Sequence, residues 1–475
     1  MASHRRLAAF LTSLFFAVVP LAARASTAPD VLVVGGTPAG VAAAIAAARD
    51  GADVTLVARG PVLGGILTDG MMDQWDINVG PTGNAIQGGL FREIHARLGD
   101  SFTPQAAASV FADLIAREPR ITVRTGLTLE AVDTATSAPD SRRVERVRFT
   151  DTRNHVETIT ADAVIDATDN GDLAALAGAR YDLGRQDTGR DERTQAVTLM
   201  FALRGVDWLR LASSYENARY GPGGATERRA WGYSATLADY VPLSRDILVR
   251  DLNLGRESTG SVTVNAIDVL GIDGLKREDL ARARSLTERE APHLVDFLRT
   301  RLPGFENASV DRFARAIYVR ETRHFAGLER LRESDVWNGR VPFDAIGLSS
   351  YPMDLHPTTH DEKLAYAPLR HVYGVPFGAL VPRGFSNLLL ASPSISATHI
   401  AAGSARVIPT TIEEGEAAGT ACAIALRGHL SFSEFVTDPR AFLSLRDDLL
   451  IHGVLLPEIA ESDHGARPSS GTTRA

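Results

Sequence analysis

The segment that most constrains the fold of this chain is a strand, a glycine-rich turn, a helix and a second strand near the amino end. Residues 31–34 (VLVV) form a short valine-rich run, which is typical of a buried parallel strand. The glycine-rich turn at 35–40 follows, and the alanine-rich stretch 41–49 favours a helix. Residues 54–57 (VTLV) indicate the second strand. Because this is the order of one βαβ unit, we predict an α/β fold on a parallel sheet.

The glycine-rich turn is suited to a dinucleotide pyrophosphate. A glycine directly after the strand lets the chain leave it sharply, and the last glycine lets helix and strand approach closely. The N–H groups and dipole of the helix N-terminus then face the phosphates. A tight turn that binds nothing is the alternative. We predict cofactor contacts along the whole turn: Gly35, Gly36, Thr37, Pro38, Ala39 and Gly40.

Two residues depart from the usual dinucleotide-binding pattern. Thr37 stands where the middle glycine is expected, so it crowds the backbone that faces the phosphates. An acidic residue that binds a ribose hydroxyl usually follows the turn by about twenty residues. Ala58 and Arg59 occupy that place here. Arg59 is therefore a candidate cofactor residue, and the 2′-phosphate of NADP is one alternative ligand for it.

Three later segments extend the pattern. Gly64 and Gly65 form a glycine pair that lets the backbone lie against a flat or charged ligand. Residues 162–168 indicate another buried strand, which ends at Ala167 and Thr168. Residues 387–392 indicate a further strand, followed by a loop up to residue 410 and a helix from about 411 to 426.

The order of these segments resembles the FAD-dependent oxidoreductases of the glutathione-reductase-like fold. The similarity covers about residues 29–457. It is carried by GGTPAG at 35–40, LGG at 63–65, IDAT and GDLAALAG within 165–178, RETRHFAG at 320–327, SYPMDLH at 350–356, YGVPFGALVPRG at 373–384, ISATHIAAGSARVIPT at 395–410 and EAAGTACAIAL at 416–426.

This resemblance implies FAD as the cofactor and a Rossmann-type FAD-binding domain that is discontinuous in sequence, with an inserted α+β substrate domain. The 35–40 turn would bind the pyrophosphate, and the 395–410 loop with the start of the next helix would reach the flavin ring. The further cofactor-binding residues that it implies are Gly64, Gly65, Ala167, Thr168, Ser396, Thr398 and Gly403.

Three cofactor-lining places differ from the family pattern. The family has an acidic residue where Ala58 stands, and glycine where Asp169 and near where Ser392 stand. An aspartate beside a pyrophosphate is repulsive unless it points away. These changes leave open a chain with weakened FAD binding, or a non-catalytic binding protein on a degenerate flavin fold.

The first 25 residues are typical of a secretory signal. Arg5 and Arg6 precede an apolar run at 7–19, and Pro20 and the small-x-small site at 23–25 follow. We expect cleavage after Ala25 and a periplasmic or secreted protein; an uncleaved membrane anchor is the alternative, and the choice between the general and twin-arginine routes stays open.

The composition limits which binding partners, membrane spans and disulfides are expected. A net charge of −8 gives no electrostatic reason to expect a nucleic-acid partner. No other stretch is long and apolar enough to span a membrane, so no stable span is expected after cleavage. The single cysteine, Cys422, cannot form an internal disulfide and is expected in the core.

We divide the chain from its patterns. We expect the first part of the FAD-binding domain at 29–184, a substrate or cap domain at 185–370, the return of the FAD-binding domain at 371–460, and a disordered tail at 461–475. The middle part breaks the βαβ rhythm, with strands near 196–203 and 262–264 and a helix at about 275–301. Such a domain would close over the flavin.

Flavin chemistry needs a base near the acidic proton of the substrate and a donor that stabilises developing charge. The predicted catalytic residues are His399, Arg406 and His356, with Tyr351 and Arg320 as further candidates. A structural role is the alternative for His399, Arg406, His356 and Arg320. We expect no metal, since His356 and His360 are separated by Pro357 and its neighbours, which disfavours one shared helix face.

The predicted function is that of an FAD-dependent dehydrogenase or oxidase that transfers hydride from a small organic substrate to flavin outside the cytoplasm. NAD(P)H is scarce there, so the electron acceptor would be a quinone, a carrier protein or oxygen. An NAD(P)H-dependent flavin monooxygenase is the second hypothesis, with Arg59 as its support. The non-catalytic binding protein is the third.

Overall fold

A five-stranded parallel sheet lies at the centre of the computed structural model, which describes residues 28–215, 218–362 and 365–457. The strand order is β23-β7-β1-β2-β3, and every neighbouring pair is parallel. The predicted α/β fold class is therefore confirmed. The strands are β1 (Val31–Val34), β2 (Val54–Ala58), β3 (Ile121–Thr125), β7 (Ala163–Asp166) and β23 (Leu388–Leu390).

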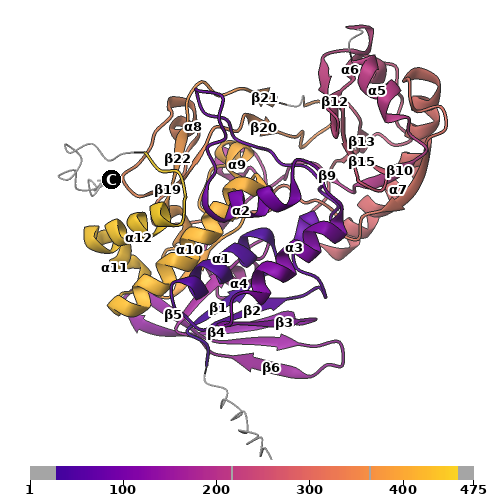
Figure 1. The fold of residues 1–475 in the computed structure, drawn as a ribbon. Helices are drawn as coiled ribbons and strands as arrows, with labels where there is room; N and C mark the ends of the chain where they lie inside the picture. Colours follow the sequence, from indigo (N-terminus) through magenta and orange to yellow (C-terminus); the bar gives the residue numbers. More distant parts are fainter. Residues whose placement is uncertain (1–27, 216–217, 363–364, 458–475) are drawn as a thin grey trace, which may run out of the picture.

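The predicted βαβ unit at the amino end forms β1, α1 (Pro38–Arg49) and β2. Helix α1 is buried along nearly its whole length because α10 (Ile408–Gly428) covers it (Figure 1). Small residues make this contact possible. A Cβ at Gly415 would lie 2.1 Å from the carbonyl oxygen of Ala39, and one at Gly419 would lie 2.2 Å from that of Ala43. The alanine-rich sequence thus serves helix packing as well as helix formation.

A three-stranded meander lies below the parallel sheet in the view of Figure 1 and shares its hydrophobic core. It consists of β4 (Thr128–Ala138), β5 (Ser141–Thr150) and β6 (Val156–Ile159). Further helices of this body are α2 (Gly89–Leu98), α3 (Pro104–Ala116), α4 (Asp172–Leu176), α9 (His399–Ala405), α11 (Phe432–Thr437) and α12 (Pro439–Ile451), with 3-10 turns η1 (Gly65–Leu67), η2 (Gln186–Thr188) and η4 (Phe377–Leu380).

A second body with its own core lies at the upper right of Figure 1. Its six-stranded antiparallel sheet has the order β11-β12-β14-β15-β10-β17. The strands are β11 (Gly223–Ala225), β12 (Arg229–Gly232), β14 (Leu252–Arg256), β15 (Val262–Asn265), β10 (Phe201–Arg204) and β17 (Ser309–Phe313). Around it lie β9 (Val197–Thr198), β13 (Ile247–Leu248), β16 (Asp268–Val269), α5 (Trp208–Ser214), η3 (Ala218–Tyr220), α6 (Ser234–Leu237) and α7 (Arg277–Arg301).

The chain returns to the first body earlier than the sequence division at residue 370 has it. Phe325, Ile346 and Met353 belong to the core of the first body. Strand pairing explains this, since β18 pairs with β8 and β19 pairs with β22. These elements are β8 (Tyr181–Leu183), β18 (Arg323–Phe325), α8 (Glu333–Asn338), β19 (Ala345–Ser349), β20 (Met353–Leu355), β21 (Ala365–Ala367) and β22 (Tyr373–Pro376).

The loop that we expect at 395–410 contains helix α9, and α10 begins at Ile408 rather than near 411. Thr398 explains the extra helix, because its side chain accepts a hydrogen bond from the N–H of Ala401 and caps the first turn. The expected leader at 1–25 and tail at 461–475 lie outside the described residues. Among the helices of the described part, none has the length and apolar character needed to cross a membrane.

Candidate functional site

The site is built at the carboxyl ends of the parallel strands, where the strand order reverses on either side of β1. Gly35 leaves β1 with a φ of +127°, and a Cβ there would lie 2.2 Å from the carbonyl oxygen of Ala167. Thr37 occupies the place of the middle glycine. Its hydroxyl donates to the carbonyl oxygen of Ala167 at 2.9 Å and accepts from the N–H of Gly40 at 3.1 Å. The threonine thus caps α1 and joins the turn to the end of β7.

The second glycine pair lies against this turn. The N–H of Gly64 donates to the carbonyl oxygen of Gly36 at 2.7 Å. Gly64 and Gly65 have φ values of +110° and +46°, and a Cβ at Gly65 would lie 3.4 Å from the Cα of Thr37. Two stretches of backbone free of side chains therefore meet at the end of β1, as a cradle for a dinucleotide requires.

The place of the usual ribose-binding acid is filled by apolar packing. The Cβ of Ala58 lies 2.7 Å from where a Cβ at Gly36 would stand, and Ala58 is buried. Arg59, the next residue, follows β2 directly and has an exposed side chain. Arg59 is thus the first side chain past β2 that is open to a ligand.

Asp166 organises the segment after β7. Its carboxylate is fully buried and accepts hydrogen bonds from the N–H and hydroxyl of Thr168 and from the N–H of Ala174. Burial raises the pKa of Asp166 to about 6, although the hydrogen bonds from Ala174 and Thr168 favour the carboxylate. Asp169, where the family has glycine, is exposed, and its carbonyl oxygen accepts from the hydroxyl of Ser394.

The carboxyl-terminal segment offers polar atoms that have no partner within the protein. The hydroxyls of Ser396 and Thr410 are buried and form no hydrogen bond among the described residues. Buried polar atoms are normally paired, so these two hydroxyls fit a bound ligand that accepts or donates there. The other two residues implied on this segment have structural explanations. Thr398 caps α9, and Gly403 faces Leu355, whose Cδ2 lies 2.8 Å from the position of a Cβ.

These observations test whether the chain suits FAD. Side-chain-free backbone meets at the Gly35 turn, the N-terminus of α1 is directed there, and unpaired hydroxyls lie on the return segment. The residues present therefore fit FAD. Gly403 packs against β20 on its Cβ side, so only its backbone could contact the cofactor.

His399 begins α9 and lies against a buried carboxylate. Its Nδ1 is 2.6 Å from Oε1 of Glu321, and the same oxygen is 2.8 Å from Nε2 of His324. Burial disfavours the Glu321 carboxylate, but hydrogen bonds from His324 and His399 outweigh it and lower the pKa of Glu321 to about 2. The N–H of His399 donates to Oδ2 of Asp187 at 3.0 Å. His399 is thus held at both its backbone and its ring.

Arg406 and His356 meet at one aspartate. Asp354 lies 3.0 Å from Nη2 of Arg406 and 3.7 Å from Nε2 of His356. On its other side, His356 lies 2.7 Å from Asp268, which is also 3.4 Å from Arg320. Burial raises the pKa of Asp268, but His356 and Arg320 outweigh it and lower the value to about 2. Each buried basic side chain of this cluster therefore lies beside a carboxylate of opposite charge.

Gln195 joins the two clusters. Its N–H donates to Oε2 of Glu321 at 3.0 Å, and its side-chain oxygen accepts from the N–H of His356 at 3.1 Å. Gln195 and Glu321 lie on the two chain connections between the bodies, so the clusters sit where pockets between domains usually form. The structure thus brings His356 and Arg406 together and places His399 in a neighbouring cluster.

Sequence reasoning missed four residues of this site: Gln195, Asp268, Glu321 and Asp354. Two of them carried a signal, because Glu321 stands beside Arg320 in RETRHFAG and Asp354 lies within SYPMDLH. Asp268 comes from the second body and Gln195 from the connection that leads into it, and nothing in their local sequence marks them. The hydroxyl of Tyr351, a further candidate, donates a hydrogen bond to Asp76. Burial raises the pKa of Tyr351 well above its usual value.

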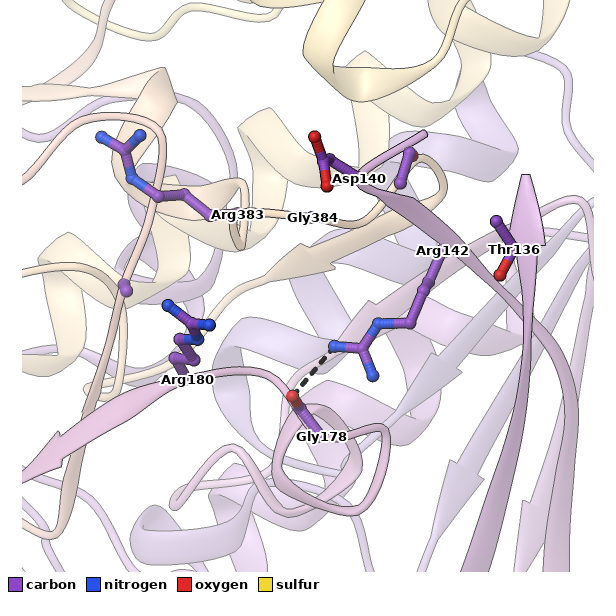
Figure 2. Close-up of a pocket in the computed structure, with 9 residues that line it drawn as sticks. Thr136, Asp140, Arg142, Gly178, Arg180, Arg383 and Gly384 are labelled. Atoms are coloured by element: carbon purple, nitrogen blue, oxygen red, sulfur yellow. Dashed lines mark hydrogen bonds between the residues drawn. The ribbon is translucent and has the colours of Figure 1, made fainter. Parts of the chain in front are cut away.

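A surface pocket of about 470 Å³ lies elsewhere (Figure 2). Its lining comes from the β4–β5 turn, the segment after α4 and the loop before β23, and includes Arg142, Arg180 and Arg383. Arg142 donates to the carbonyl oxygens of Ala177 and Gly178. Arg383 donates to that of Leu328. The pocket is separate from the ends of the parallel strands and does not contribute to the site above.

Comparison with known proteins agrees with the cofactor fit. The sequence matches the family model described as FAD dependent oxidoreductase over residues 30–443. No curated protein matches it significantly. Among solved structures, it is similar to a geranylgeranyl bacteriochlorophyll reductase-like protein from Thermoplasma acidophilum, at 13% identity over 89% of this chain and 83% of that chain, with a TM-score of 0.45.

Two further structures are similar at the same level. One is p-nitrophenol 4-monooxygenase from Pseudomonas putida, at 12% identity over 90% of this chain and 87% of that chain, with a TM-score of 0.41. The other is a flavoprotein/dehydrogenase from Cytophaga hutchinsonii, at 11% identity over 86% and 82%, with a TM-score of 0.42. The family match spans most of the sequence, and the chain therefore belongs to the FAD dependent oxidoreductase family, as an enzyme with FAD as its cofactor.

Proposed function

We propose that the enzyme oxidises a small organic substrate directly, outside the cytoplasm, with His399 taking the proton that the substrate releases. FAD, when bound, supplies the acceptor for the hydride. The substrate thus loses one proton and one hydride, which together amount to a two-electron oxidation. A quinone, a carrier protein or oxygen then takes the electrons.

The observation that carries this proposal is the contact of His399 with the ionised Glu321. An imidazole that donates Nδ1–H to a carboxylate keeps a lone pair on Nε2 and gains a counter-charge when it is protonated. Nε2 of His399 has no hydrogen-bond partner among the described residues, and 11% of the side chain is exposed. The ring is therefore available to a substrate at the junction of the two bodies.

Arg406 and His356 would shape the neighbouring part of the substrate site. Arg406 is buried, and its Nε has no partner among the described residues. The guanidinium is held by Asp354 and the hydroxyl of Tyr318. Because nearby carboxylates offset its charge, we expect Arg406 to orient an uncharged polar group rather than to attract an anion.

The location rests on the first 25 residues alone. Their basic start, apolar run and small-x-small site are those of an export signal. NAD(P)H is scarce outside the cytoplasm, so reduction by the substrate itself is the consistent route. Fractionation of cells that express the full chain should find the mature protein outside the cytoplasm, starting at residue 26. A cytoplasmic protein with an intact amino end would contradict this part.

The experiment for the reaction is anaerobic mixing of the holoenzyme with a panel of small alcohols, amines and acids, followed by flavin absorbance. A substrate that bleaches the flavin without NAD(P)H supports the proposal. His399→Ala should then slow bleaching by about 100-fold, in line with the loss of a general base. The control is His452→Ala. His452 is a partly exposed histidine that pairs with Asp50, and neither residue belongs to the site described above. An unchanged rate in His399→Ala would remove His399 from the mechanism.

An NAD(P)H-dependent monooxygenase is the second candidate. Its one specific support is Arg59, which is exposed at the carboxyl end of β2, where a 2′-phosphate binds in NADP-dependent folds. Reduction of the flavin by NADPH, lost in Arg59→Ala, would favour this function. A flavin that NADPH leaves oxidised would count against it.

A further inference from the structure

One carboxylate oxygen of Glu321 serves two imidazoles. Oε1 lies 2.6 Å from Nδ1 of His399 and 2.8 Å from Nε2 of His324. The other oxygen, Oε2, accepts from the N–H of Gln195 at 3.0 Å. The Glu321 side chain has no exposed area, and these three hydrogen bonds are the ones that its carboxylate forms among the described residues.

The contacts define where the protons of both rings lie. An ionised carboxylate only accepts hydrogen bonds, so each ring nitrogen that faces Oε1 carries a proton. Neutral His399 therefore has its proton on Nδ1 and a lone pair on Nε2. Neutral His324 has the reverse arrangement, with its proton on Nε2.

The two histidines differ in access. The side chain of His324 is 1% exposed, and its Nδ1 is buried without a partner. The side chain of His399 is 11% exposed, and its Nε2 is not among the buried atoms that lack a partner. Of the two rings on Glu321, only that of His399 offers a free nitrogen to a ligand.

The charged groups around His399 come from several elements. Asp187 of η2 accepts the N–H of His399, and Arg330 lies 3.4 Å from the same aspartate and 2.9 Å from Asp182. Within the described part of the chain, Glu321 is the one carboxylate paired with the ring. The ring orientation therefore depends on Glu321, whereas Asp187 holds the backbone.

A metal ion is a poorer explanation of this cluster. The ligand atoms of Glu321, His324 and His399 lie within 4.8 Å of one another. A tetrahedral ion with bonds of about 2.0–2.1 Å would separate its ligand atoms by about 3.3 Å. The observed oxygen–nitrogen separations of 2.6 and 2.8 Å are shorter and match hydrogen bonds that involve a charged group.

We propose that Glu321 is a positioning residue that holds His399 in the tautomer with the proton on Nδ1, so that Nε2 takes the proton of the substrate. His324 occupies the same oxygen as a second, buried donor and restricts the rotation of the carboxylate. In the step itself, the proton leaves the substrate and binds Nε2, and the imidazolium that forms is neutralised by Glu321. This inference rests on the proposed function.

The test combines a tautomer measurement with kinetics on the holoenzyme. Nitrogen-15-labelled histidine and NMR report which ring nitrogen carries the proton, and His399→Gln identifies the signals of His399. We expect Nδ1–H in the wild type and a mixture of tautomers in Glu321→Gln. The variant should lose about 100-fold in kcat with KM changed less than about twofold and an unaltered flavin spectrum. Glu329→Gln, which removes a partly exposed carboxylate paired with Arg340, should change none of these.

Several results would overturn the proposal. Wild-type His399 with its proton on Nε2 would do so even if Glu321→Gln does not fold, because that measurement needs only the wild type and His399→Gln. An unchanged tautomer or kcat in Glu321→Gln would also do so, as would one bound metal per chain in the purified protein. Failure of the proposed function is distinguishable, since His399→Ala would then reduce its flavin normally while the tautomer result stands on its own.

Discussion

The hydroxyl of Thr37 donates a hydrogen bond to the carbonyl oxygen of Ala167 at 2.9 Å. This bond joins the turn after β1 to the end of β7, which is distant in the sequence. It also explains how a threonine replaces the usual middle glycine. The side chain bonds within the protein and caps α1 through the N–H of Gly40, so the turn is stabilised rather than disrupted.

Loss of the Thr37 hydroxyl should weaken the cradle before it affects the rest of the fold. Thr37→Ala removes the cap and the bond to Ala167, and we expect the free energy of unfolding to fall by about 1–2 kcal/mol. The dissociation constant of FAD should rise as well. Thr37→Ser keeps the hydroxyl and should retain most of both. Urea unfolding of the apoprotein and FAD titration measure the two effects; equal behaviour of the two variants would contradict the role.

Gly35 allows no side chain, because a Cβ would lie 2.2 Å from the carbonyl oxygen of Ala167. Gly35→Ala should therefore destabilise the protein by at least about 2 kcal/mol more than Gly51→Ala. Gly51 is the matched control, since its φ of +99° is also positive but nothing lies within 4 Å of its Cβ position. Thermal unfolding of both variants makes the comparison. A similar loss of stability in both variants would mean that the positive φ, and not the close approach to Ala167, causes the destabilisation.

The sequence was sufficient to predict the parallel sheet and the dinucleotide turn, because each depends on local pattern. Valine-rich strands, glycine at positive φ and an alanine-rich helix are encoded within a few residues of each other. The boundary at residue 370 was not predictable in this way. It depends on β19 pairing with β22 and β18 with β8, and such pairings are not visible in either strand alone.

The site was only partly predictable for the same reason. His399, Arg406 and His356 stood out as residue types that carry chemistry. Their partners come from distant segments, as Glu321 does for His399 and Asp268 does for His356. Gly403 stays a prediction, because a glycine in such a loop has the same sequence signal whether its backbone faces a ligand or it packs against a residue such as Leu355.

The ion network between the bodies should be sensitive to loss of one carboxylate. Asp268 pairs with both Arg320 and His356, and Arg320 is 2% exposed in its side chain. Asp268→Asn leaves this buried guanidinium without its counter-charge, so we expect a loss of about 3 kcal/mol or more. Asp246→Asn removes a largely exposed pair with Arg282 and should cost less than about 1 kcal/mol. Urea unfolding at neutral pH measures both losses. An equal loss of unfolding free energy in the two variants would contradict the prediction.

Asp73 should make the stability depend on pH. Burial raises its pKa to about 7, and the charge of Glu257 adds to this, against the hydrogen bond from Thr263. The unfolded chain has an aspartate pKa near about 3.9. The folded state thus retains the proton to higher pH, so the contribution of Asp73 is present below about pH 4 and is lost as the pH rises to about 7.

Removal of this group should flatten that part of the pH profile. We expect Asp73→Asn to show a smaller fall in the free energy of unfolding between pH 4 and 8, by at most about 4 kcal/mol. The exposed Asp140 provides the control in Asp140→Asn, whose profile should follow the wild type. Unfolding in urea across this range checks the prediction. If the pH profile of Asp73→Asn ran parallel to that of the wild type, groups other than Asp73 would cause the fall in unfolding free energy.

The glycine-rich backbone at the end of β1 is assigned here to the binding of FAD. The most direct measurement is the visible absorption spectrum of the purified full-length protein, followed by titration of the stripped protein with FAD. We expect flavin bands, one FAD per chain, and loss of both in Gly35→Ala. A colourless wild-type protein that takes up no added FAD would contradict it.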